Sequence, residues 1–372
     1  MKKQRFWSTV VFFALAAVAG IAAAQAPTST GTWTFGVSGD SRDCGDFVVP
    51  AIATKVKAEK DLFYWHLGDF RKIQKADQDL LSMLPPGTPP PTLEAYQKIA
   101  WDDFITHQMA SFGDLPVYLG RGNHEAILPM TRAGYIAKFS SFLNRPDLVA
   151  QRKIDEAAEL EVDANYDGKA LFGTQPWFHF IRDGVDFITL DNADYDEFSI
   201  GQMRWLRTVL NLDLAPNSGI RSIVVGMHEA LPNSTSIDHG MNDWAQGTHT
   251  GATVYTWLYD ANAAGKHVYV IASHSHFYSP NIFYTYYWFE YYGKTMLPGW
   301  IVGTAGAHRY ALPSGADKDS ETNIYGYVQG TVHADGTIDL VLHKLTESDL
   351  IQSKWPSAPL AAIKDCVDNN RN

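Results

Sequence analysis

The chain has 372 residues, of which 45% are hydrophobic and 13% aromatic, so it can bury a sizeable core. Charged residues make up 19% of the sequence, which is typical of a globular protein and excludes an intrinsically disordered one. The formal net charge of -11 gives no general attraction to polyanions, so we expect no extended binding along nucleic acid or an anionic membrane. A small anionic substrate in a locally positive pocket stays possible.

Residues 1–26 have the pattern of a secretory signal peptide. Basic residues within the first five positions precede an apolar stretch from Phe6 to Ala24, and residues 22–26 offer small side chains for an A-x-A-like cleavage site. An uncleaved membrane anchor is the alternative, because the apolar stretch is nearly long enough to span a bilayer. We expect cleavage, hence a protein exported to the periplasm or secreted, with no membrane attachment afterwards.

The rest of the chain predicts one domain over residues 27–345 and a tail over 346–372. Short apolar runs bounded by turn residues predict strands at 33–37, 63–67, 117–119, 177–181, 186–190, 223–225, 268–271, 325–332 and 337–342. Helical periodicity predicts helices at 47–59, 94–111 and 148–160, and the proline run at 85–91 predicts a loop. Helix 148–160 either caps a site or presents a solvated outer face. Hairpins mixed with strand–helix units predict an α/β (α+β mixed) sandwich of two mixed sheets with helices outside.

Five short polar motifs follow five of these predicted strands. They are Gly39-Asp40-Ser41-Arg42, Gly68-Asp69, Gly122-Asn123-His124-Glu125, Met227-His228-Glu229 and Ser273-His274-Ser275-His276. Asp, Asn and His bind divalent metals through oxygen and imidazole nitrogen. In open α/β sheets the ligand site forms beyond the carboxyl ends of the strands, so we expect these loops to converge on one site.

The ordered set of motifs resembles that of the calcineurin-like metallophosphoesterase superfamily, which includes the purple acid phosphatases. That family carries Asp in a first GDx-type motif, GD in the second, GNH(E/D) in the third, a lone His in the fourth and GHxH in the fifth. The matching positions are Asp40, Asp69, Asn123, His124, His228, His274 and His276. The resemblance extends over roughly residues 31–345, and it implies a four-layer αββα fold.

Carried over residue by residue, the resemblance implies two adjacent metal ions, divalent or mixed-valence, of Mn, Zn or Fe. Asp69 would bridge the two ions. One ion would be completed by Asn123, His228 and His274, and the other by Asp40 and His276. His124 would face the substrate as a general acid or as a phosphate contact. Such a pair can generate hydroxide from a bound water and clamp both oxygens of an in-line phosphoryl displacement.

The function implied is hydrolysis of a small phosphate ester by metal-activated hydroxide at a dinuclear centre. We expect a phosphomonoesterase. A phosphodiesterase with the same site is one alternative, because the motifs do not fix the substituents of the ester. A non-catalytic module that binds metal or phosphate on a degraded first metal site is the other.

Two positions depart from the family pattern. Many members have His where this chain has Arg42, and the purple acid phosphatases have Tyr where it has Lys72. Arginine stays protonated and cannot coordinate a cation. Either Arg42 binds the substrate phosphate, as a residue of the catalytic machinery, with water completing the metal shell, or the first metal site is weak or lost. We favour the first reading, since the other metal's ligands are all present.

The two cysteines, Cys44 and Cys366, are expected to form a disulfide in an oxidising compartment. This bond would tie the tail to the loop that carries Asp40. Two free thiols are the alternative. The spacing is unlike that of a redox-catalytic pair.

Other polar residues near the motifs have several possible roles. His66 lies inside a predicted strand, and we expect it to be a buried, hydrogen-bonded residue rather than a ligand. Glu125 and Glu229 follow motif residues and are candidates to orient the histidines. His239 and His249 lie after the fourth motif, from where they could reach a substrate.

An aromatic run at residues 283–292 follows the fifth motif. It could form a wall for a sugar, base or aryl leaving group. The alternative, which we favour, is a strand pair or sheet edge with its rings packed inward.

Overall fold

The computed structural model describes residues 31–162, 173–353 and 358–371. The predicted signal peptide and its cleavage site lie outside these residues. Among the described helices, none combines the length and the apolar character needed to cross a membrane.

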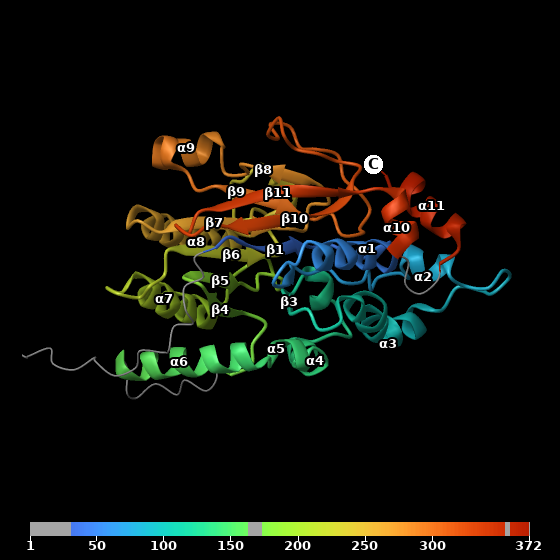
Figure 1. Ribbon diagram of the computed structural model, residues 1–372, viewed down its shortest axis with the longest axis horizontal. Helices are drawn as coiled ribbons and strands as arrows, with labels where there is room; N and C mark the ends of the chain where they lie inside the picture. Colours follow the sequence, from blue (N-terminus) through green and yellow to red (C-terminus); the bar gives the residue numbers. More distant parts are fainter. Residues whose placement is uncertain (1–30, 163–172, 354–357, 372) are drawn as a thin grey trace, which may run out of the picture.

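Two mixed β-sheets form the centre of the molecule (Figure 1). The first has five strands in the order β11-β10-β1-β2-β3 and consists of β1 (Trp33–Ser38), β2 (Tyr64–His66), β3 (Val117–Leu119), β10 (Tyr325–Val332) and β11 (Ile338–Leu345). The second has six strands in the order β4-β5-β6-β7-β9-β8 and consists of β4 (Phe178–Arg182), β5 (Val185–Thr189), β6 (Ser222–Met227), β7 (His267–Ala272), β8 (Tyr278–Pro280) and β9 (Gly299–Val302).

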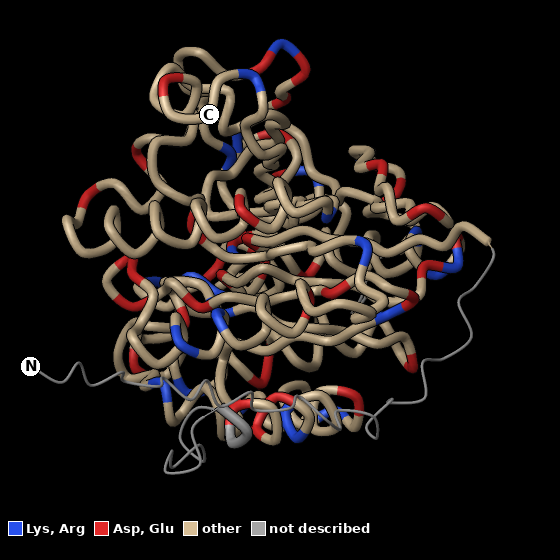
Figure 2. Tube along the Cα trace, turned by 90° about the vertical axis from the view of Figure 1, so that its left-hand side faces the viewer, with Lys and Arg blue, Asp and Glu red and all other residues tan. Residues whose placement is uncertain are grey.

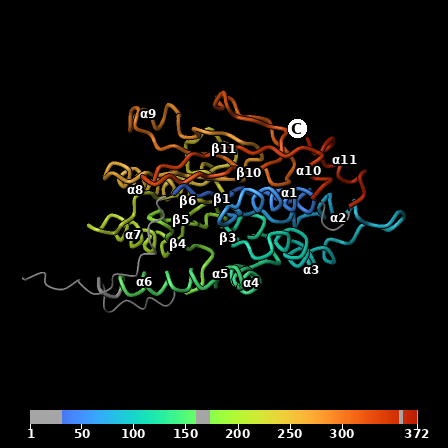
Figure 3. The backbone as a smooth tube through the Cα atoms, in the orientation of Figure 1, coloured from blue at the N-terminus to red at the C-terminus, as the bar shows by residue number. Residues whose placement is uncertain are grey.

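Strand direction places the polar motifs at one edge of each sheet. β1, β2 and β3 are parallel to one another, as are β5, β6, β7 and β9. The antiparallel pairs are β10 with β1 and β11, β4 with β5, and β8 with β9. Segments from near the two ends of the chain therefore meet in the first sheet, where the blue strand β1 lies beside the red strand β10 in Figure 3.

The two sheets pack face to face through aromatic side chains. The ring of Phe63 stacks on that of Phe35 with centroids 5.1 Å apart, and both meet the edge of Phe187 from the other sheet. Trp65 donates from its indole nitrogen to Thr189 Oγ1 across the interface at 3.1 Å. A Cβ at Gly226 would lie 2.3 Å from the Trp65 ring, so only glycine lets the sheets approach this closely.

Helices cover both outer faces. On the side of the first sheet lie α1 (Gly45–Ala58), α2 (Gln78–Ser82), α3 (Leu93–Asp103), α4 (Arg132–Lys138), α5 (Ser140–Leu143), α10 (Glu347–Ser353) and α11 (Leu360–Asn369). On the side of the second lie α6 (Pro146–Val162), α7 (Ile200–Leu214), α8 (Ala245–Ala263) and α9 (Tyr286–Tyr292). A sheet that is covered by helices on one face and by the other sheet on the opposite face needs apolar side chains on both faces. In strand β7, Val270 packs toward α7 and α8, and Ile271 packs between the sheets. The predicted four-layer αββα sandwich is therefore confirmed.

The expected disulfide is present. Cys44 and Cys366 are bonded, with Cα atoms 6.0 Å apart, and both are fully buried. The bond joins α11 in the tail to the residue that precedes α1. In Figure 3 the red C-terminal helices accordingly lie beside the blue helix α1.

One expectation about a single element is wrong, and one open alternative is decided. The aromatic run forms the short helix α9 rather than a strand pair, and most of its rings are exposed; only Phe283 and Trp288 are buried. The helix predicted at 148–160 is α6, which packs on β4 and α7 at the lower edge of Figure 1. Because α6 lines no part of the cleft described below, it does not cap the site.

Candidate metal centre

The five motif loops converge beyond the carboxyl ends of β1, β2, β3, β6 and β7. The loops are joined through the backbone: the amide of Asp40 donates to Gly68 O at 2.9 Å, and that of Ser273 donates to His228 O at 2.9 Å. Asp40, Asp69 and His274 have φ angles of 62°, 60° and 63°, a left-handed conformation that is uncommon outside glycine. Backbone strain of this kind gathers at functional sites.

Around His228, side-chain oxygens and imidazole nitrogens with lone pairs lie close together. His228 Nε2 lies 2.9 Å from His274 Nδ1, 3.1 Å from Asn123 Oδ1 and 3.2 Å from Asp69 Oδ1. Asp40 joins this group: one ligand atom from each of Asp40, Asp69, His228 and His274 lies within 4.8 Å of all the others. Such a cluster of acceptors repels itself unless a cation or a proton lies among them.

The ring of His228 is oriented by its other nitrogen. Nδ1 lies 3.0 Å from the carbonyl of Leu67 and 3.1 Å from Ser273 Oγ. Since Nδ1–H donates to that carbonyl, Nε2 points its lone pair at the acceptor group. Burial by itself lowers the pKa of His228, but the carboxylate of Asp69 overrides this and raises the pKa to about 10. Without a metal, the site holds a proton at this position, which a bound cation would displace.

Oxygen and imidazole ligands in this arrangement fit one divalent cation. The donor set consists of two carboxylates, one amide oxygen and two imidazoles, which suits Zn, Mn or Fe. Buried oxygens Asp40 Oδ1 and Asp69 Oδ2 have no hydrogen-bond partner. Unsatisfied buried carboxylate oxygens of this kind are expected beside a cation, whether a metal ion or a charged side chain.

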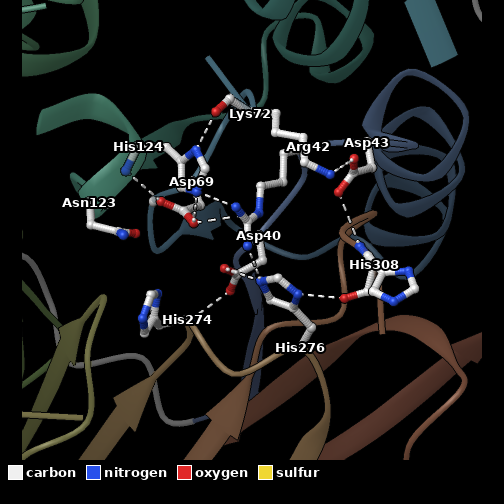
Figure 4. A network of polar contacts seen from close by, with 12 residues as sticks. Asp40, Arg42, Asp43, Asp69, Lys72, Asn123, His124, His274, His276 and His308 are labelled. Atoms are coloured by element: carbon white, nitrogen blue, oxygen red, sulfur yellow. Dashed lines mark hydrogen bonds and ion pairs between the residues drawn. The ribbon is translucent and has the colours of Figure 1, made fainter. Parts of the chain in front are cut away.

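The guanidinium of Arg42 lies on the other side of Asp69 (Figure 4). One of its terminal nitrogens donates to His276 Nε2 at 2.9 Å and to the hydroxyl of Tyr310 at 3.3 Å. The other donates to His124 Nε2, and Nε lies 3.7 Å from Asp69 Oδ2. Burial lowers the pKa of Arg42, but the charge of Asp69 overrides this, so the pKa stays raised and the group is a permanent cation.

The two histidines that accept from Arg42 have matching orientations. His124 Nδ1 donates to the carbonyl of Lys72 at 2.5 Å, and His276 Nδ1 donates to that of His308 at 2.5 Å. In both rings Nε2 is therefore the acceptor. Burial lowers the pKa of each ring, and so does the nearby charge of Arg42, which keeps both rings neutral. His276 is 3.3 Å from Asp40 Oδ1 through the same Nε2.

Glu125 has a different role from the one expected. Glu125 accepts from the backbone amides of Asp69 at 2.8 Å, Phe70 at 2.9 Å and Gly122 at 2.8 Å. It therefore fixes the relative position of two motif loops instead of orienting a histidine ring. Burial raises the pKa of Glu125 to about 7, aided by the charge of Asp69. Burial also raises the pKa of Glu229 well above its usual range, and Asp196 adds to the shift.

The other histidines fall into three positions. His66 is fully buried, accepts from the amide of Gly68 at 3.3 Å, and has its pKa lowered to about 3 by burial, so it is the neutral structural residue expected. His239 reaches the site: its ring stacks on Tyr310 with centroids 4.8 Å apart and meets the edge of His274 at 5.1 Å. His249 is exposed on α8.

A cleft of about 710 Å³ opens at the Arg42 side of the site. Its inner end is lined by Arg42, His276 and Tyr310. Its walls come from the loop after β2, with Lys72 and Lys75, and from α11. The motifs predicted two residues of the inner end, Arg42 and His276. They could not predict Tyr310 or the wall formed by α11, because neither belongs to a motif.

Two mixed sheets between helices carry a histidine- and carboxylate-rich centre at their strand ends. No family model matches the sequence, and no curated protein matches it either.

Solved structures provide the comparison. The purple acid phosphatase PPD1 from seeds of yellow lupin (Lupinus luteus) matches with a TM-score of 0.55 and 12% identity, over 86% of this chain and 52% of that one. PhoD matches with a TM-score of 0.48 and 14% identity, over 86% and 73%. A dimetal phosphatase from Danio rerio matches with a TM-score of 0.44 and 13% identity, over 84% and 96%. The chain thus shares the fold of the lupin enzyme and spans about half of its length.

Proposed function

We propose that this chain is an exported, metal-dependent phosphoesterase that hydrolyses small phosphate esters, preferentially monoesters. The observation that carries the proposal is the convergence of His228 Nε2, Asn123 Oδ1, Asp69 Oδ1 and His274 Nδ1 on one point, beside a cleft that ends at an arginine. The fold shared with the lupin phosphatase supports the same chemistry.

Each residue of the centre has a role in this proposal. Asp40, Asp69, Asn123, His228 and His274 hold a divalent cation. When bound, it would withdraw electron density from a phosphate oxygen and lower the pKa of a water molecule. Arg42 lines the inner end of the cleft, where its charge attracts the phosphate group.

His124 was expected to be a general acid or a phosphate contact. Its lowered pKa leaves it without a proton to give at Nε2, and that atom already accepts from Arg42. We therefore propose that His124 positions the arginine. The tautomer required for this is set by the carbonyl of Lys72.

A preference for monoesters follows from charge. A phosphomonoester is a dianion near neutral pH, whereas a diester carries one charge. The cleft is lined by three cations, Arg42, Lys72 and Lys75, and by two carboxylates, Asp43 and Asp365. Lys72 is paired with Asp43 at 2.7 Å, which leaves Lys75 as the exposed cation of the cleft. Elsewhere, acidic and basic positions are interspersed in the view of Figure 2, without an extended basic stretch.

The test is turnover of para-nitrophenyl phosphate and of its bis-ester by purified protein, with metal content measured in the same samples. We expect faster hydrolysis of the monoester, loss of activity with a chelator and recovery on adding metal. His274→Ala should remove activity, whereas His249→Ala, which changes an exposed histidine on α8, should retain it. A faster diester reaction would make the protein a phosphodiesterase.

The position of Arg42 favours one alternative from another class. A protein whose centre has lost a metal ligand could bind metal or phosphate without turnover. It would bind metal and phosphate in the same samples while hydrolysing neither ester at saturating metal. That result would replace the enzyme with a binding module.

Export is the part of the proposal that rests on the sequence of residues 1–26. The buried disulfide between Cys44 and Cys366 supports it, because such bonds persist in oxidising compartments. The intact mass of protein recovered from an exporting host is the test. A mature chain that begins close to residue 27 is expected, and a chain retaining residues 1–26 would contradict cleavage.

A further inference from the structure

A second group of hydrogen-bond acceptors lies beside the proposed metal ligands, and the guanidinium of Arg42 occupies the space between these acceptors. Asp69 Oδ2 and Asp40 Oδ1, both buried and without a hydrogen-bond partner, border this space. His124 and His276 turn their Nε2 lone pairs into it. In Figure 4 the guanidinium lies between the carboxylate of Asp69 and the ring of His276.

Three of the four groups that could bind a second metal here, His124, His276 and Asp69, already face the positive charge of Arg42. His276 Nε2 accepts an N–H from Arg42, and so does His124 Nε2. The carboxylate of Asp69 is 3.7 Å from Arg42 Nε. A divalent ion in this space would have to displace these hydrogen bonds and lie beside a group that cannot lose its proton.

The guanidinium is held in place by the polar and aromatic groups around it. Arg42 is 8% exposed, and its terminal nitrogen also donates to the hydroxyl of Tyr310. The Tyr310 ring lies flat on His276, with centroids 3.9 Å apart, and His239 stacks on the same tyrosine. The stack thus fixes the tyrosine hydroxyl and the His276 ring to which this end of the guanidinium donates.

We infer that the guanidinium of Arg42 is a built-in second cation, so that the centre takes one metal ion rather than two. The ion belongs to the group of Asp40, Asp69, Asn123, His228 and His274. Arg42 neutralises the outer oxygen of Asp69 and presents a fixed positive charge to the inner end of the cleft. The inference rests on the metal binding in the proposed function, and it replaces the expectation of a dinuclear centre.

One substitution should turn the one-metal centre into a two-metal centre. In Arg42→His the charge is removed and a neutral imidazole is added next to Asp40, Asp69 and His276, which together form a second ligand set. Arg42→Lys keeps a cation there. Arg182→His is the matched control, because it changes an exposed arginine at the end of β4.

The experiment is the number of Mn²⁺ ions bound per chain at saturation, measured by elemental analysis and by titration calorimetry. We expect one in the wild type, in Arg42→Lys and in Arg182→His, and two in Arg42→His. Electron paramagnetic resonance should show an isolated ion in the wild type and an exchange-coupled pair in Arg42→His. Circular dichroism identifies variants that fail to fold, and the wild-type count tests the inference without any variant.

The outcomes separate the inference from the proposed function. Two ions in the wild type would overturn the inference and leave the phosphoesterase intact. A single ion in folded Arg42→His would show that the arginine is not what excludes the second, and would overturn it too. One ion without turnover would uphold the inference and refute the enzyme. A wild type that binds no ion would remove the site on which both depend.

Discussion

At the scale of single residues, the metal centre is held in a conformation that the chain would not choose on its own. Asp40, Asp69 and His274 occupy left-handed backbone, which costs roughly 1–2 kcal/mol for each non-glycine residue. Their side chains then crowd against other acceptors: His228 Nε2 lies 2.9 Å from His274 Nδ1 and 3.2 Å from Asp69 Oδ1. A bound cation would relieve this repulsion, so metal binding and folding stability should be linked.

Asp69→Asn tests that link. Asparagine tolerates left-handed backbone and keeps the shape of the side chain, so the substitution removes mainly the charge. We expect metal affinity to fall by roughly 100-fold or more, because a central carboxylate ligand is lost. In the wild type, metal at 100 times its dissociation constant should stabilise the fold by about 2.7 kcal/mol. The variant should show little of this gain at the same metal concentration, as measured by thermal unfolding.

A comparison with Asp194→Asn controls for the loss of a carboxylate elsewhere. Asp194 pairs with Arg121 at 2.8 Å and is not one of the proposed ligands, so this variant should keep the full stabilisation by metal. If Asp69→Asn retained wild-type affinity and the same thermal shift, Asp69 would not be a ligand.

At the scale of elements, α6 is attached through a buried charged triad rather than through apolar packing alone. His179 on β4 lies 2.9 Å from Asp155 of α6 and 2.7 Å from Asp186 of β5, and all three are buried. Farther along α6, Glu159 accepts from Arg204 of α7 at 2.7 Å. The helix is thus fixed to both the sheet and the next helix, which explains why it lies at the outer face and not over the cleft.

The triad makes stability depend on pH. Burial lowers the pKa of His179, but Asp155 and Asp186 override it and raise the pKa well above 6.5. Below about pH 6.5 the unfolded histidine is also protonated, so the full stabilisation is present there. As pH rises from 6.5 toward the folded pKa, the unfolded state loses its proton first, and the contribution of the triad is lost. Nearby Asp213 also faces Asp186 and keeps its proton because burial raises its pKa.

His179→Gln should lower the free energy of unfolding by about 3–5 kcal/mol near pH 6, since it breaks a buried ion pair and leaves its partners uncompensated. The gap between wild type and variant should shrink between pH 6.5 and 9. Urea unfolding across this range measures it, with His343→Gln, a half-buried residue on β11, expected within about 0.5 kcal/mol of wild type. A gap that is constant with pH would refute a charged triad.

The elements also show what could be predicted from sequence. The motif strands were predictable because each is a short apolar run that ends in a polar loop, as for β6 before His228. The strand pair predicted at 283–292 is wrong. Aromatic residues favour strands by propensity, but here the segment forms a short helix in which Trp288 is the buried residue. The cleft wall at Tyr310 follows β9, a strand of four residues that the pattern did not reveal.

The residues proposed as metal ligands were the predictable part of the site, and the position of the arginine was not. Asp69, Asn123, His228 and His274 do come together, as the order of their motifs implied. The sequence left open whether Arg42 points to substrate or occupies a metal position. Only the three-dimensional positions of His124, His276 and Tyr310, which come from loops far apart in the chain, decide where its guanidinium lies.

At the scale of the whole molecule, the C-terminal tail forms part of the cleft. Asp365, Asn369 and Asn370 of the tail line it opposite Lys72 and Lys75. Beyond the disulfide, the tail is held by buried polar contacts. Asn370 donates to the hydroxyl of Tyr325 at 2.6 Å and to the carbonyl of Gly306 at 3.1 Å, and Arg309 donates to Asn370 O at 2.6 Å. The cleft wall is thus built from residues more than 280 positions apart in sequence.

Loss of the disulfide should therefore affect stability and substrate binding in different degrees. Cys366→Ser opens a bond that closes a loop of 322 residues, and we expect it to lower the free energy of unfolding by about 2–4 kcal/mol. Because Arg309, Asn370 and Tyr325 still hold the tail, the cleft should persist in the folded protein. KM for para-nitrophenyl phosphate should then rise less than threefold, by roughly 0.6 kcal/mol or less. Urea unfolding and steady-state kinetics measure the two effects.

The double variant Cys44→Ser/Cys366→Ser distinguishes the bond from the thiols. If the cross-link is what stabilises the fold, the single and double variants should unfold at nearly the same urea concentration, and reducing agent should shift only the wild type. An unchanged midpoint in the single variant would refute the stabilising bond. A KM increase of tenfold or more would show that the polar contacts of the tail cannot hold the cleft wall without it.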